Sequence, residues 1–227
     1  MPGVEVAGSI RQVGDGVSGL NPGQPVASLT RGHGYAEVAR AAAELTVPLP
    51  ENLAGRPESG GMLVTVPLAL MLLRRVARVQ PEETVLLHGA AGGVGTVTGQ
   101  LARHWGLRPL LGTASSPAKA EFARGYGYSQ VFSYADFPEG VLAARAGQGV
   151  DVVLDPVGGQ VRAMSFELLA PFGRLVTYSN ISPASRRSYR TPPGCGPAAS
   201  DTSGSPAASC RCVTPPWSGR RCWRPPG

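Results

Sequence analysis

Cysteine is absent from the first 180 residues of this 227-residue chain. All four cysteines come later, at Cys195, Cys210, Cys212 and Cys222. A body without cysteine argues against both a disulfide scaffold and a thiolate metal site. The spacing of the four cysteines does not match a zinc knuckle either, so we predict no metal site among them.

Lysine is almost absent, because Lys119 is the only lysine among 21 basic residues. The net charge of +6 would by itself suggest nucleic acid or an anionic membrane as a partner. Basic and acidic residues balance over residues 1–180, however, and the whole excess lies in residues 181–227. The arginines of that segment are not interleaved on a helix, so we predict no nucleic-acid partner.

Long hydrophobic runs are missing as well. No apolar run approaches the roughly 20 residues that span a bilayer, so we predict no membrane partner. The first residues, "MPGVEVAGSI", have neither the basic region nor the apolar stretch of a signal peptide. These absences predict a cytoplasmic protein.

Residues 1–60 contain short β segments separated by glycine and proline turns. Val4 and Val6 occupy alternate positions of one segment, and the dipeptide Asp15-Gly16 marks a turn between segments. This pattern predicts a small antiparallel barrel or sandwich.

Residues 61–180 follow a different pattern, in which strand and helix signals alternate. An apolar helix or helix pair comes first, and we expect Pro67 to interrupt it because an interior proline loses a backbone hydrogen bond. Strands are then predicted at 84–88, 110–113, 131–134, 150–155 and 174–179, and helices at 96–105, 117–124, 139–146 and 164–169. The alternation predicts an α/β fold with a doubly wound parallel (Rossmann) sheet.

A glycine loop connects the first of these strands to its helix, with the pattern Ala90-x-Gly92-x-x-Gly95. In such a loop the first small residue permits the sharp turn, and Gly92 lets the backbone approach a pyrophosphate. Gly95 lets the helix pack against the sheet. The helix start then binds the anion through its N–H groups. The alternative is a tight strand–helix turn without a ligand, but the strand before and the helix after favour a dinucleotide.

The end of the second strand indicates which dinucleotide is bound. NAD-specific folds place an acid there, about 20 residues after the loop, to bind the ribose 2′-hydroxyl. This chain has Ser115, Ser116 and Lys119 instead, and no acid before Glu121. Hydroxyl groups and a cation suit a 2′-phosphate, so we predict NADP(H). The alternative is that Lys119 is only an exposed helix residue and Ser116 only an N-cap.

Several motifs together resemble the zinc-independent quinone oxidoreductases, the zeta-crystallin-like branch of the medium-chain dehydrogenase/reductase superfamily. They are "PGVEVAGSI", "GYAEV", "VQPEETVLLHGAAGGVGTVTGQLAR", "GTASSPAKAEFAR", "GVDVVLDPVGG" and "LLAPFGRLVTYSN". The resemblance implies a partial GroES-like substrate domain over 1–60 and a Rossmann NADP(H)-binding domain over 61–180. It also implies NADPH-dependent hydride transfer to a quinone or an activated C=C bond, and it allows a homodimer.

The resemblance also assigns cofactor-binding residues, although it names no catalytic residue. Those at the pyrophosphate are Ala90, Gly92, Gly93, Val94 and Gly95, and those at the 2′-phosphate and adenosine are Ser115, Lys119 and Tyr134. Two stretches, Asp155 to Gly159 and Thr177 to Asn180, would line the nicotinamide side. Asp155 can equally be a carboxylate that caps its own loop, and Tyr134 an ordinary strand aromatic.

A zinc-dependent relative is disfavoured by the same residues. Catalytic zinc needs about three Cys, His or carboxylate ligands that converge on one point. The body offers only His33, His88 and His104, each in a different segment. We therefore expect no metal.

Three departures from the family pattern lead to a competing hypothesis. The chain starts at a point that the family reaches after further barrel strands, and the resemblance stops at Asn180. In between, Val66, Pro67 and Leu68 replace the polar members of a stretch that lines the nicotinamide in the family. Residues 181–227 lack periodicity and are expected to be disordered and out of frame. The alternative to an active reductase is thus a non-catalytic NADP(H)-binding remnant from a truncated or frameshifted gene.

Overall fold

The computed structural model describes residues 2–107 and 109–181. The expectation of disorder and of an out-of-frame origin for 181–227 therefore lies, apart from Ile181, outside the described residues.

The first described strands form a three-stranded antiparallel sheet in the order β1-β2-β3. These strands are β1 (Glu5–Ser9), β2 (Pro25–Leu29) and β3 (Thr46–Pro48), with the short 3₁₀ helix η1 (Ala43–Leu45) before β3. Ala27 in the central strand pairs with Ala7 on one side and with Val47 on the other. Three strands of this length are too few to close on themselves, so this region is a single sheet rather than the predicted barrel or sandwich.

A helical segment follows, made of η2 (Pro57–Gly61), α1 (Met62–Met71) and the π-helical η3 (Leu72–Val76). The prediction that Pro67 interrupts this helix is wrong, because α1 continues through it. Pro67 is exposed, so its ring lies on the solvent side of the helix. The irregularity comes five residues later, as the π-helical turn.

The same segment corrects the prediction about hydrophobic length. By length and composition alone, Pro57–Val76 is apolar enough to cross a membrane. Its second half contributes to the core, however, because Ala69, Leu72 and Leu73 are all buried.

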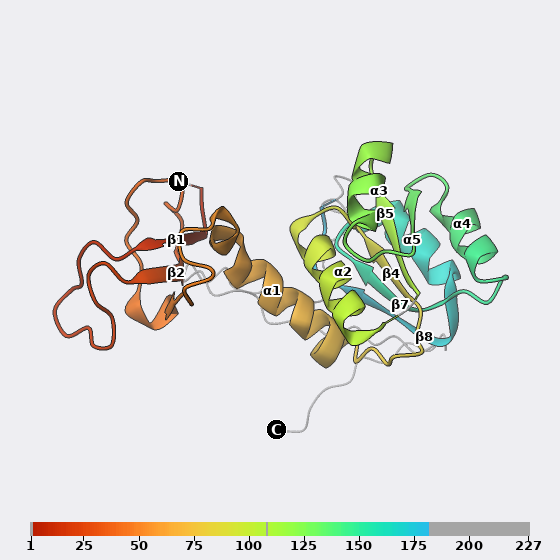
Figure 1. Ribbon diagram of the computed structural model, residues 1–227. Helices are drawn as coiled ribbons and strands as arrows, with labels where there is room; N and C mark the ends of the chain where they lie inside the picture. The colour runs from red at the N-terminus through yellow and green to blue at the C-terminus, as the bar shows by residue number, and fades with distance from the viewer. Residues whose placement is uncertain (1, 108, 182–227) are drawn as a thin grey trace, which may run out of the picture. The chain divides into compact units, whose positions relative to one another are not determined.

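The second sheet has five parallel strands in the order β6-β5-β4-β7-β8 (Figure 1). Its strands are β4 (Val85–His88), β5 (Leu110–Ala114), β6 (Gln130–Ser133), β7 (Val150–Asp155) and β8 (Leu169–Thr177). Its helices are α2 (Gly93–Trp105), α3 (Pro117–Arg124), α4 (Phe137–Ala144) and α5 (Gly159–Glu167). The order reverses at β4, which confirms the predicted doubly wound sheet.

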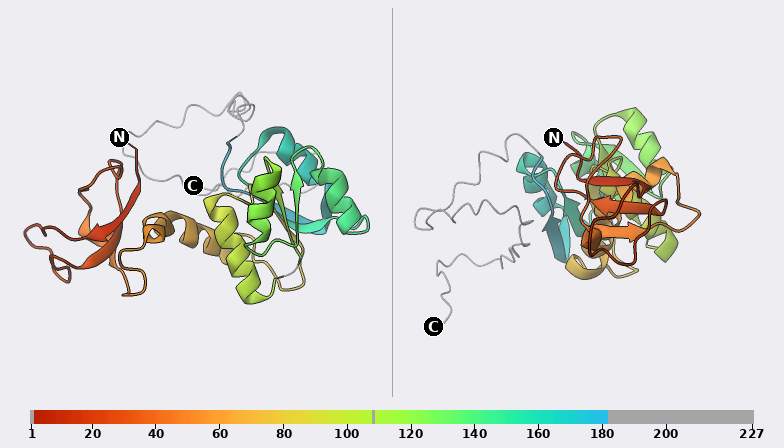
Figure 2. Two further views of the ribbon diagram at one scale, coloured as in Figure 1. Left: turned by 45° about the horizontal axis from the view of Figure 1, so that its top comes forward. Right: turned by 90° about the vertical axis from the view of Figure 1, so that its left-hand side faces the viewer.

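Two hydrophobic clusters lie on opposite faces of this sheet. Helices α2 and α3 cover one face and α4 and α5 the other (Figures 1 and 2). Consecutive residues of β4 alternate between the clusters, with Val85 and Leu87 in one and Leu86 in the other. Burial on both faces explains why the strands read as continuous apolar runs.

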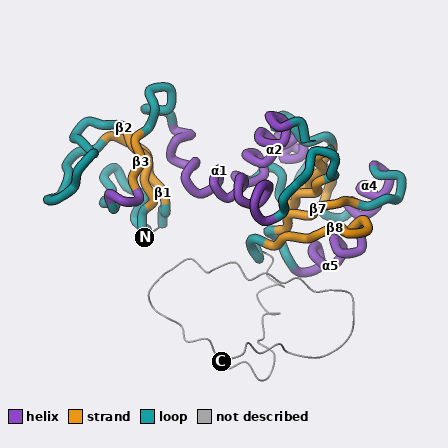
Figure 3. Tube along the Cα trace, turned by 90° about the horizontal axis from the view of Figure 1, so that it is seen from below, coloured by secondary structure: helices purple, strands orange, loops and turns teal. Residues whose placement is uncertain are grey.

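The largest boundary error concerns the end of the sheet, where β7 and β8 run side by side with α5 beside them (Figure 3). We predicted a helix at 164–169, but α5 already begins at Gly159. Strand β8 begins at Leu169 and contains an irregularity, because its pairing jumps from Leu169 to Arg174. Phe172 within that irregularity has a φ of 63°. Bulges of this kind carry no clear periodic signal in the sequence.

Candidate functional site

A cleft of about 780 Å³ opens at the carboxyl ends of the parallel strands. This is the place at which a doubly wound sheet binds its ligands. Its lining comes from α1, from the glycine loop and from the ends of β5, β6, β7 and β8. The lining residues are Leu68, Gly89, Ala91, Gly92, Gly93, Val94, Gly95, Ala114, Ser115, Lys119, Tyr134, Pro156, Val157, Tyr178, Ser179 and Ile181.

Two glycines of the loop are needed for different reasons. A Cβ atom on Gly95 would lie 2.6 Å from the carbonyl oxygen of Gly89 and closer still to that of Ala90, so only glycine fits there. A Cβ atom on Gly92 would have a single neighbour within 4 Å, the same Gly89 oxygen at 3.3 Å. Gly92 also has an ordinary φ of −81°, so a side chain there would not strain the backbone, and only the Gly89 oxygen would have to move by a few tenths of an ångström. The missing side chain of Gly92 therefore leaves space in the cleft next to the backbone.

Helix α2 begins directly at this free space. It starts at Gly93 after the N-cap Gly92, and no side chain caps it. The N–H groups of the first turn and the positive end of the helix dipole thus point to the cleft, as an anion site requires. Ala90 behaves differently: it is fully buried, and its N–H group donates to the carbonyl oxygen of Thr113. Of the five predicted pyrophosphate residues, Ala90 alone shapes the turn from behind without lining the cleft.

A second polar feature lies at the end of β5. Lys119 Nζ donates to Ser115 Oγ over 3.3 Å, and both side chains line the cleft and are exposed. Ser116 Oγ accepts from the backbone N–H of Lys119, so Ser116 caps α3 as its alternative interpretation held. This cap fixes the start of α3, and the Lys119 ammonium group and the Ser115 hydroxyl group lie next to each other in the cleft.

Two tyrosines, Tyr134 and Tyr178, contribute their rings to the cleft wall. Tyr134 follows β6 and lies with its ring centroid 6.3 Å from that of His88. Tyr178 follows β8, and burial, together with the nearby charge of Asp155, raises the pKa of its phenol above the ordinary value. Tyr178 therefore remains protonated across the physiological pH range.

Asp155 has a structural role in this geometry, in line with its loop-capping interpretation. Its carboxylate is fully buried and accepts from the N–H groups of Val157 and Gly158. Arg162 Nε donates to the same carboxylate over 2.5 Å. Asn180, which we predicted at the cofactor, lies between the lining residues Ser179 and Ile181 but is not itself among them.

His88 is the polar residue whose role the sequence does not indicate. The ring is fully buried and T-stacked on Phe137, with the centroids 5.0 Å apart. Its Nδ1 lies 3.0 Å from Thr113 Oγ1 and its Nε2 lies 2.7 Å from Ser165 Oγ. Burial lowers the pKa of the ring to about 4, against a weaker opposing effect of Asp155. His88 is therefore neutral at pH 7.

The direction of each hydrogen bond around His88 follows from the hydroxyl groups. Ser165 donates its hydrogen to the carbonyl oxygen of Val161, so it accepts from His88 Nε2–H. The other ring nitrogen, Nδ1, then accepts from the Thr113 hydroxyl group, whose oxygen also accepts from Gly89 N–H at 3.4 Å. This chain of hydrogen bonds links α5 to β4, β5 and the first residue of the glycine loop.

Three residues in or beside the cleft carry different signals in the sequence. Leu68 lines the cleft and belongs to the stretch that the family resemblance places at the nicotinamide, although its spacing in the apolar helix α1 does not distinguish it from core residues. Gly89 carried a usable signal, since it directly precedes the glycine pattern and has a φ of 77°. Arg162, which is bonded to Asp155, lies on a helix whose start was placed too late.

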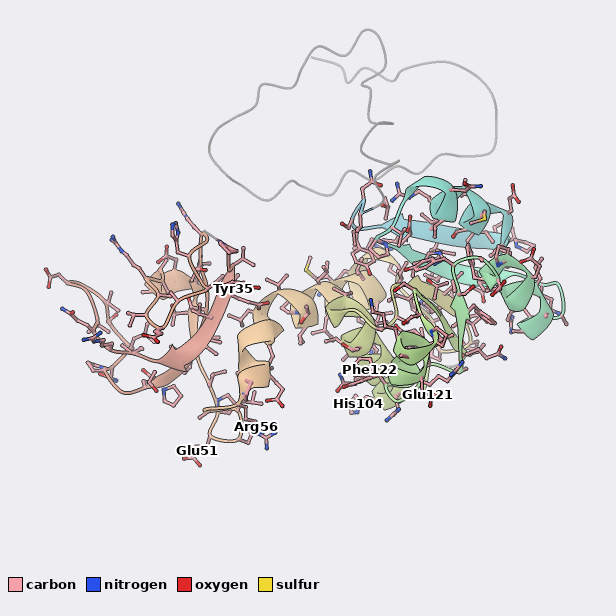
Figure 4. The ribbon with its side chains drawn as sticks, turned by 90° about the horizontal axis from the view of Figure 1, so that it is seen from above. Tyr35, Glu51, Arg56, His104, Glu121 and Phe122 are labelled. Atoms are coloured by element: carbon pink, nitrogen blue, oxygen red, sulfur yellow. The ribbon has the colours of Figure 1, made fainter. Side chains whose placement is uncertain are left out.

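Metal ligands do not gather in the part of the chain that the structure describes, where no three His, Cys, Asp or Glu residues form a group able to hold an ion. His33 lies in the loop after β2 with a φ of 65°. His104 is exposed on α2, at the outer surface where Figure 4 also shows Glu121 and Phe122 of α3.

Comparison with known proteins agrees with this geometry. The family described as "Zinc-binding dehydrogenase" matches residues 93–192, beyond the point at Asn180 where we placed the end of the resemblance. Rat (Rattus norvegicus) quinone oxidoreductase is 37% identical over 180 residues, which are 77% of this chain and 54% of that protein. The chain is thus similar to quinone oxidoreductase-like members of the medium-chain dehydrogenase/reductase superfamily.

Solved structures of this superfamily share the fold. Escherichia coli quinone oxidoreductase complexed with NADPH aligns with a TM-score of 0.73 at 30% identity, over 79% of this chain and 55% of that one. The CurK enoyl reductase aligns with a TM-score of 0.70 at 34% identity, over 79% of this chain and 54% of that one. The chain thus spans about half the length of the relatives that it matches.

Proposed function

We propose that this chain is an NADPH-dependent oxidoreductase that transfers a hydride to a quinone or to an activated C=C bond. The observation that carries the proposal is that one cleft contains both the uncapped start of α2 and the Ser115–Lys119 pair. These two features are separate anion-binding elements, as a pyrophosphate and a 2′-phosphate would need. Relatives whose names read quinone oxidoreductase and enoyl reductase support the reaction class.

The cleft fits NADPH residue by residue. The N–H groups from Gly92 to Gly95 would hold the pyrophosphate, Ser115 and Lys119 the 2′-phosphate, and Tyr134 the adenosine. The remaining end, with Pro156, Val157, Tyr178 and Ser179, would then take the nicotinamide. The cofactor, when bound, supplies the hydride.

The residues at this remaining end position the reactants and exclude water. Leu68 and Val157 contribute apolar surface to the cleft, and the raised pKa of Tyr178 keeps its phenol neutral. Hydride transfer needs the donor and acceptor close together in a cleft with little water. Hydride transfer from the bound cofactor does not require a metal ion, so we propose that catalysis is zinc-independent. We also propose that the protein is cytoplasmic and forms a homodimer. Residues 61–180 would form its cofactor-binding domain and 1–60 part of its substrate domain.

Two measurements test this function. Fluorescence titration should show that NADPH binds more tightly than NADH, and NADPH oxidation should depend on a model quinone or enone. Binding without turnover would select the alternative, a non-catalytic NADP(H)-binding protein. If neither dinucleotide binds, both versions of the proposal are wrong.

A further inference from the structure

The far end of the cleft is built from two chain segments that leave neighbouring strands. Pro156 and Val157 follow β7, and Tyr178, Ser179 and Ile181 follow β8. Two backbone hydrogen bonds join the segments, from Tyr178 N–H to the Asp155 oxygen (3.2 Å) and from Ile181 N–H to the Pro156 oxygen (3.0 Å). Ser179, between these two bonds, is held by side chains.

Two side chains bond to the Ser179 carbonyl oxygen, Thr177 at the end of β8 (Oγ1, 3.2 Å) and Arg162 on α5. Arg162 Nη2 donates to the Ser179 carbonyl oxygen (3.1 Å) and to Thr177 Oγ1 (2.7 Å), while its Nε donates to Asp155 Oδ2 (2.5 Å). One guanidinium group thus bonds to both segments at once. Only a planar group with several donors in a fixed arrangement can make such contacts together.

The Asp155 end of this bridge is rigid. The Asp155 side chain is fully buried, and the N–H groups of Val157 and Gly158 fix it in the turn after β7. The Arg162 side chain keeps 19% of its surface exposed. The buried Asp155 carboxylate therefore fixes the Arg162 guanidinium group, and that group in turn holds Thr177 and Ser179 in place through its hydrogen bonds.

We propose that Arg162 is a positioning residue that fixes the Tyr178–Ser179 wall against the Pro156–Val157 wall at the nicotinamide end of the cleft. The inference rests on the proposed function, because that function assigns this end to the nicotinamide. Ser115 and Lys119 lie after another strand and make no bond with Arg162. Loss of the bridge should therefore weaken binding of the whole dinucleotide and spare binding of its adenosine part.

Two ligands and three variants of the full chain test this inference. The ligands are NADPH and adenosine 2′,5′-bisphosphate, which carries the 2′-phosphate but no nicotinamide. Arg162→Lys keeps a positive charge for Asp155. Its single nitrogen, however, cannot bond to Asp155 and at the same time reach Thr177 and Ser179, as the two nitrogens Nε and Nη2 of Arg162 do. Thr177→Val, at an exposed position, removes one acceptor of Arg162 together with the hydrogen bond that Thr177 Oγ1 donates to the Ser179 carbonyl oxygen, and it leaves the buried ion pair intact. Arg145→Lys is the matched control, because the side chain of Arg145, the C-cap residue of α4, donates to the Gly149 carbonyl oxygen and does not line the cleft.

The expected result is a dissociation constant for NADPH that rises about tenfold in Arg162→Lys, and less in Thr177→Val, since hydrogen bonds from a charged donor are lost. The constant for adenosine 2′,5′-bisphosphate should stay unchanged, and Arg145→Lys should change neither. Equal weakening of both ligands, or no weakening of NADPH in either cleft variant, overturns the positioning role. If Arg162→Lys fails to fold, Thr177→Val decides alone. Wild-type protein that binds neither ligand would overturn the proposed function, and this inference with it.

Discussion

Arg174 and Glu83 form a two-point ion pair, in which Nη1 and Nη2 each lie 2.7 Å from a different carboxylate oxygen. Arg174 also donates to the carbonyl oxygens of Ala77 and Arg78, so it ties β8 to the chain between η3 and β4. The hydrogen bonds from Arg174 lower the pKa of the Glu83 carboxyl group. The pair is partly shielded from solvent, with 32% of the Arg174 side chain and 22% of the Glu83 side chain exposed.

Arg174→Lys should lower the free energy of unfolding by about 1–2 kcal/mol, because lysine cannot make the paired contacts. Urea unfolding measures the change. Arg124→Lys is the control, since its ion pair with Glu121 is far more exposed and should contribute little. Equal losses in the two variants would contradict a special role for the Arg174 pair.

The buried His88 should make stability depend on pH. Its pKa in the folded protein is about 4, and an unfolded histidine has a pKa near 6.5. Between these values the unfolded chain binds the proton and the folded chain does not, so stability falls as pH falls from about 6.5 to about 4. The loss should be roughly 3 kcal/mol, and it should stop below the folded pKa.

His88→Gln separates this effect from that of the carboxylates. The variant has no ring to titrate, so its free energy of unfolding should decline less steeply over the same pH range. Denaturant unfolding of both proteins at several pH values measures the difference in slope. Parallel slopes would mean that protonation of His88 does not oppose folding.

The elements that the sequence predicts best are those with local signals. Helix α3 has the predicted bounds because Ser116 and Pro117 mark its start, and β7 has them because its valines and leucine follow a glycine-rich stretch and end at Asp155. Helix α5 was placed too late because its start depends on Gly158, with φ 77° and ψ −164°, and on the Asp155 cap of the preceding turn. Neither feature has a periodicity that sequence inspection can detect.

The candidate site shows the same division. The glycine loop and Lys119 are adjacent to recognisable strand ends, so the sequence places them in the cleft. Leu68 is placed at the site by the family resemblance and not by its own spacing, whereas Arg162 reaches the site only through packing of a helix that is distant in sequence from the glycine loop. His88 was identified as the end of a strand, but its partner Ser165 lies on another element and could not be found from spacing.

Two alanine substitutions in the glycine loop should separate folding from binding. Gly95→Ala forces a methyl group against the backbone oxygens of Gly89 and Ala90, so it should destabilise the protein by about 1–3 kcal/mol or more. Gly92→Ala places the methyl group in the cleft, where the Gly89 oxygen at 3.3 Å is its single close neighbour, so it should destabilise the protein far less than Gly95→Ala. Its dissociation constant for NADPH should nevertheless rise about tenfold or more, because the backbone can no longer approach the pyrophosphate. Thermal unfolding and fluorescence titration measure the two effects, and a Gly92→Ala variant with unchanged NADPH affinity would contradict the assignment.

Lys119 should determine the preference between the two dinucleotides. NADPH differs from NADH by the 2′-phosphate, and Lys119 is the cation that lines the cleft beside the Ser115 hydroxyl group. Lys119→Ala should therefore raise the dissociation constant for NADPH about tenfold and leave that for NADH almost unchanged. Arg124→Ala removes another cation from the same helix, but Arg124 is paired with Glu121 and does not line the cleft, so it should alter neither constant. Parallel titrations with the two dinucleotides measure the ratio. If Lys119→Ala weakens both equally, the cation acts on a group that the dinucleotides share, and the 2′-phosphate must bind elsewhere.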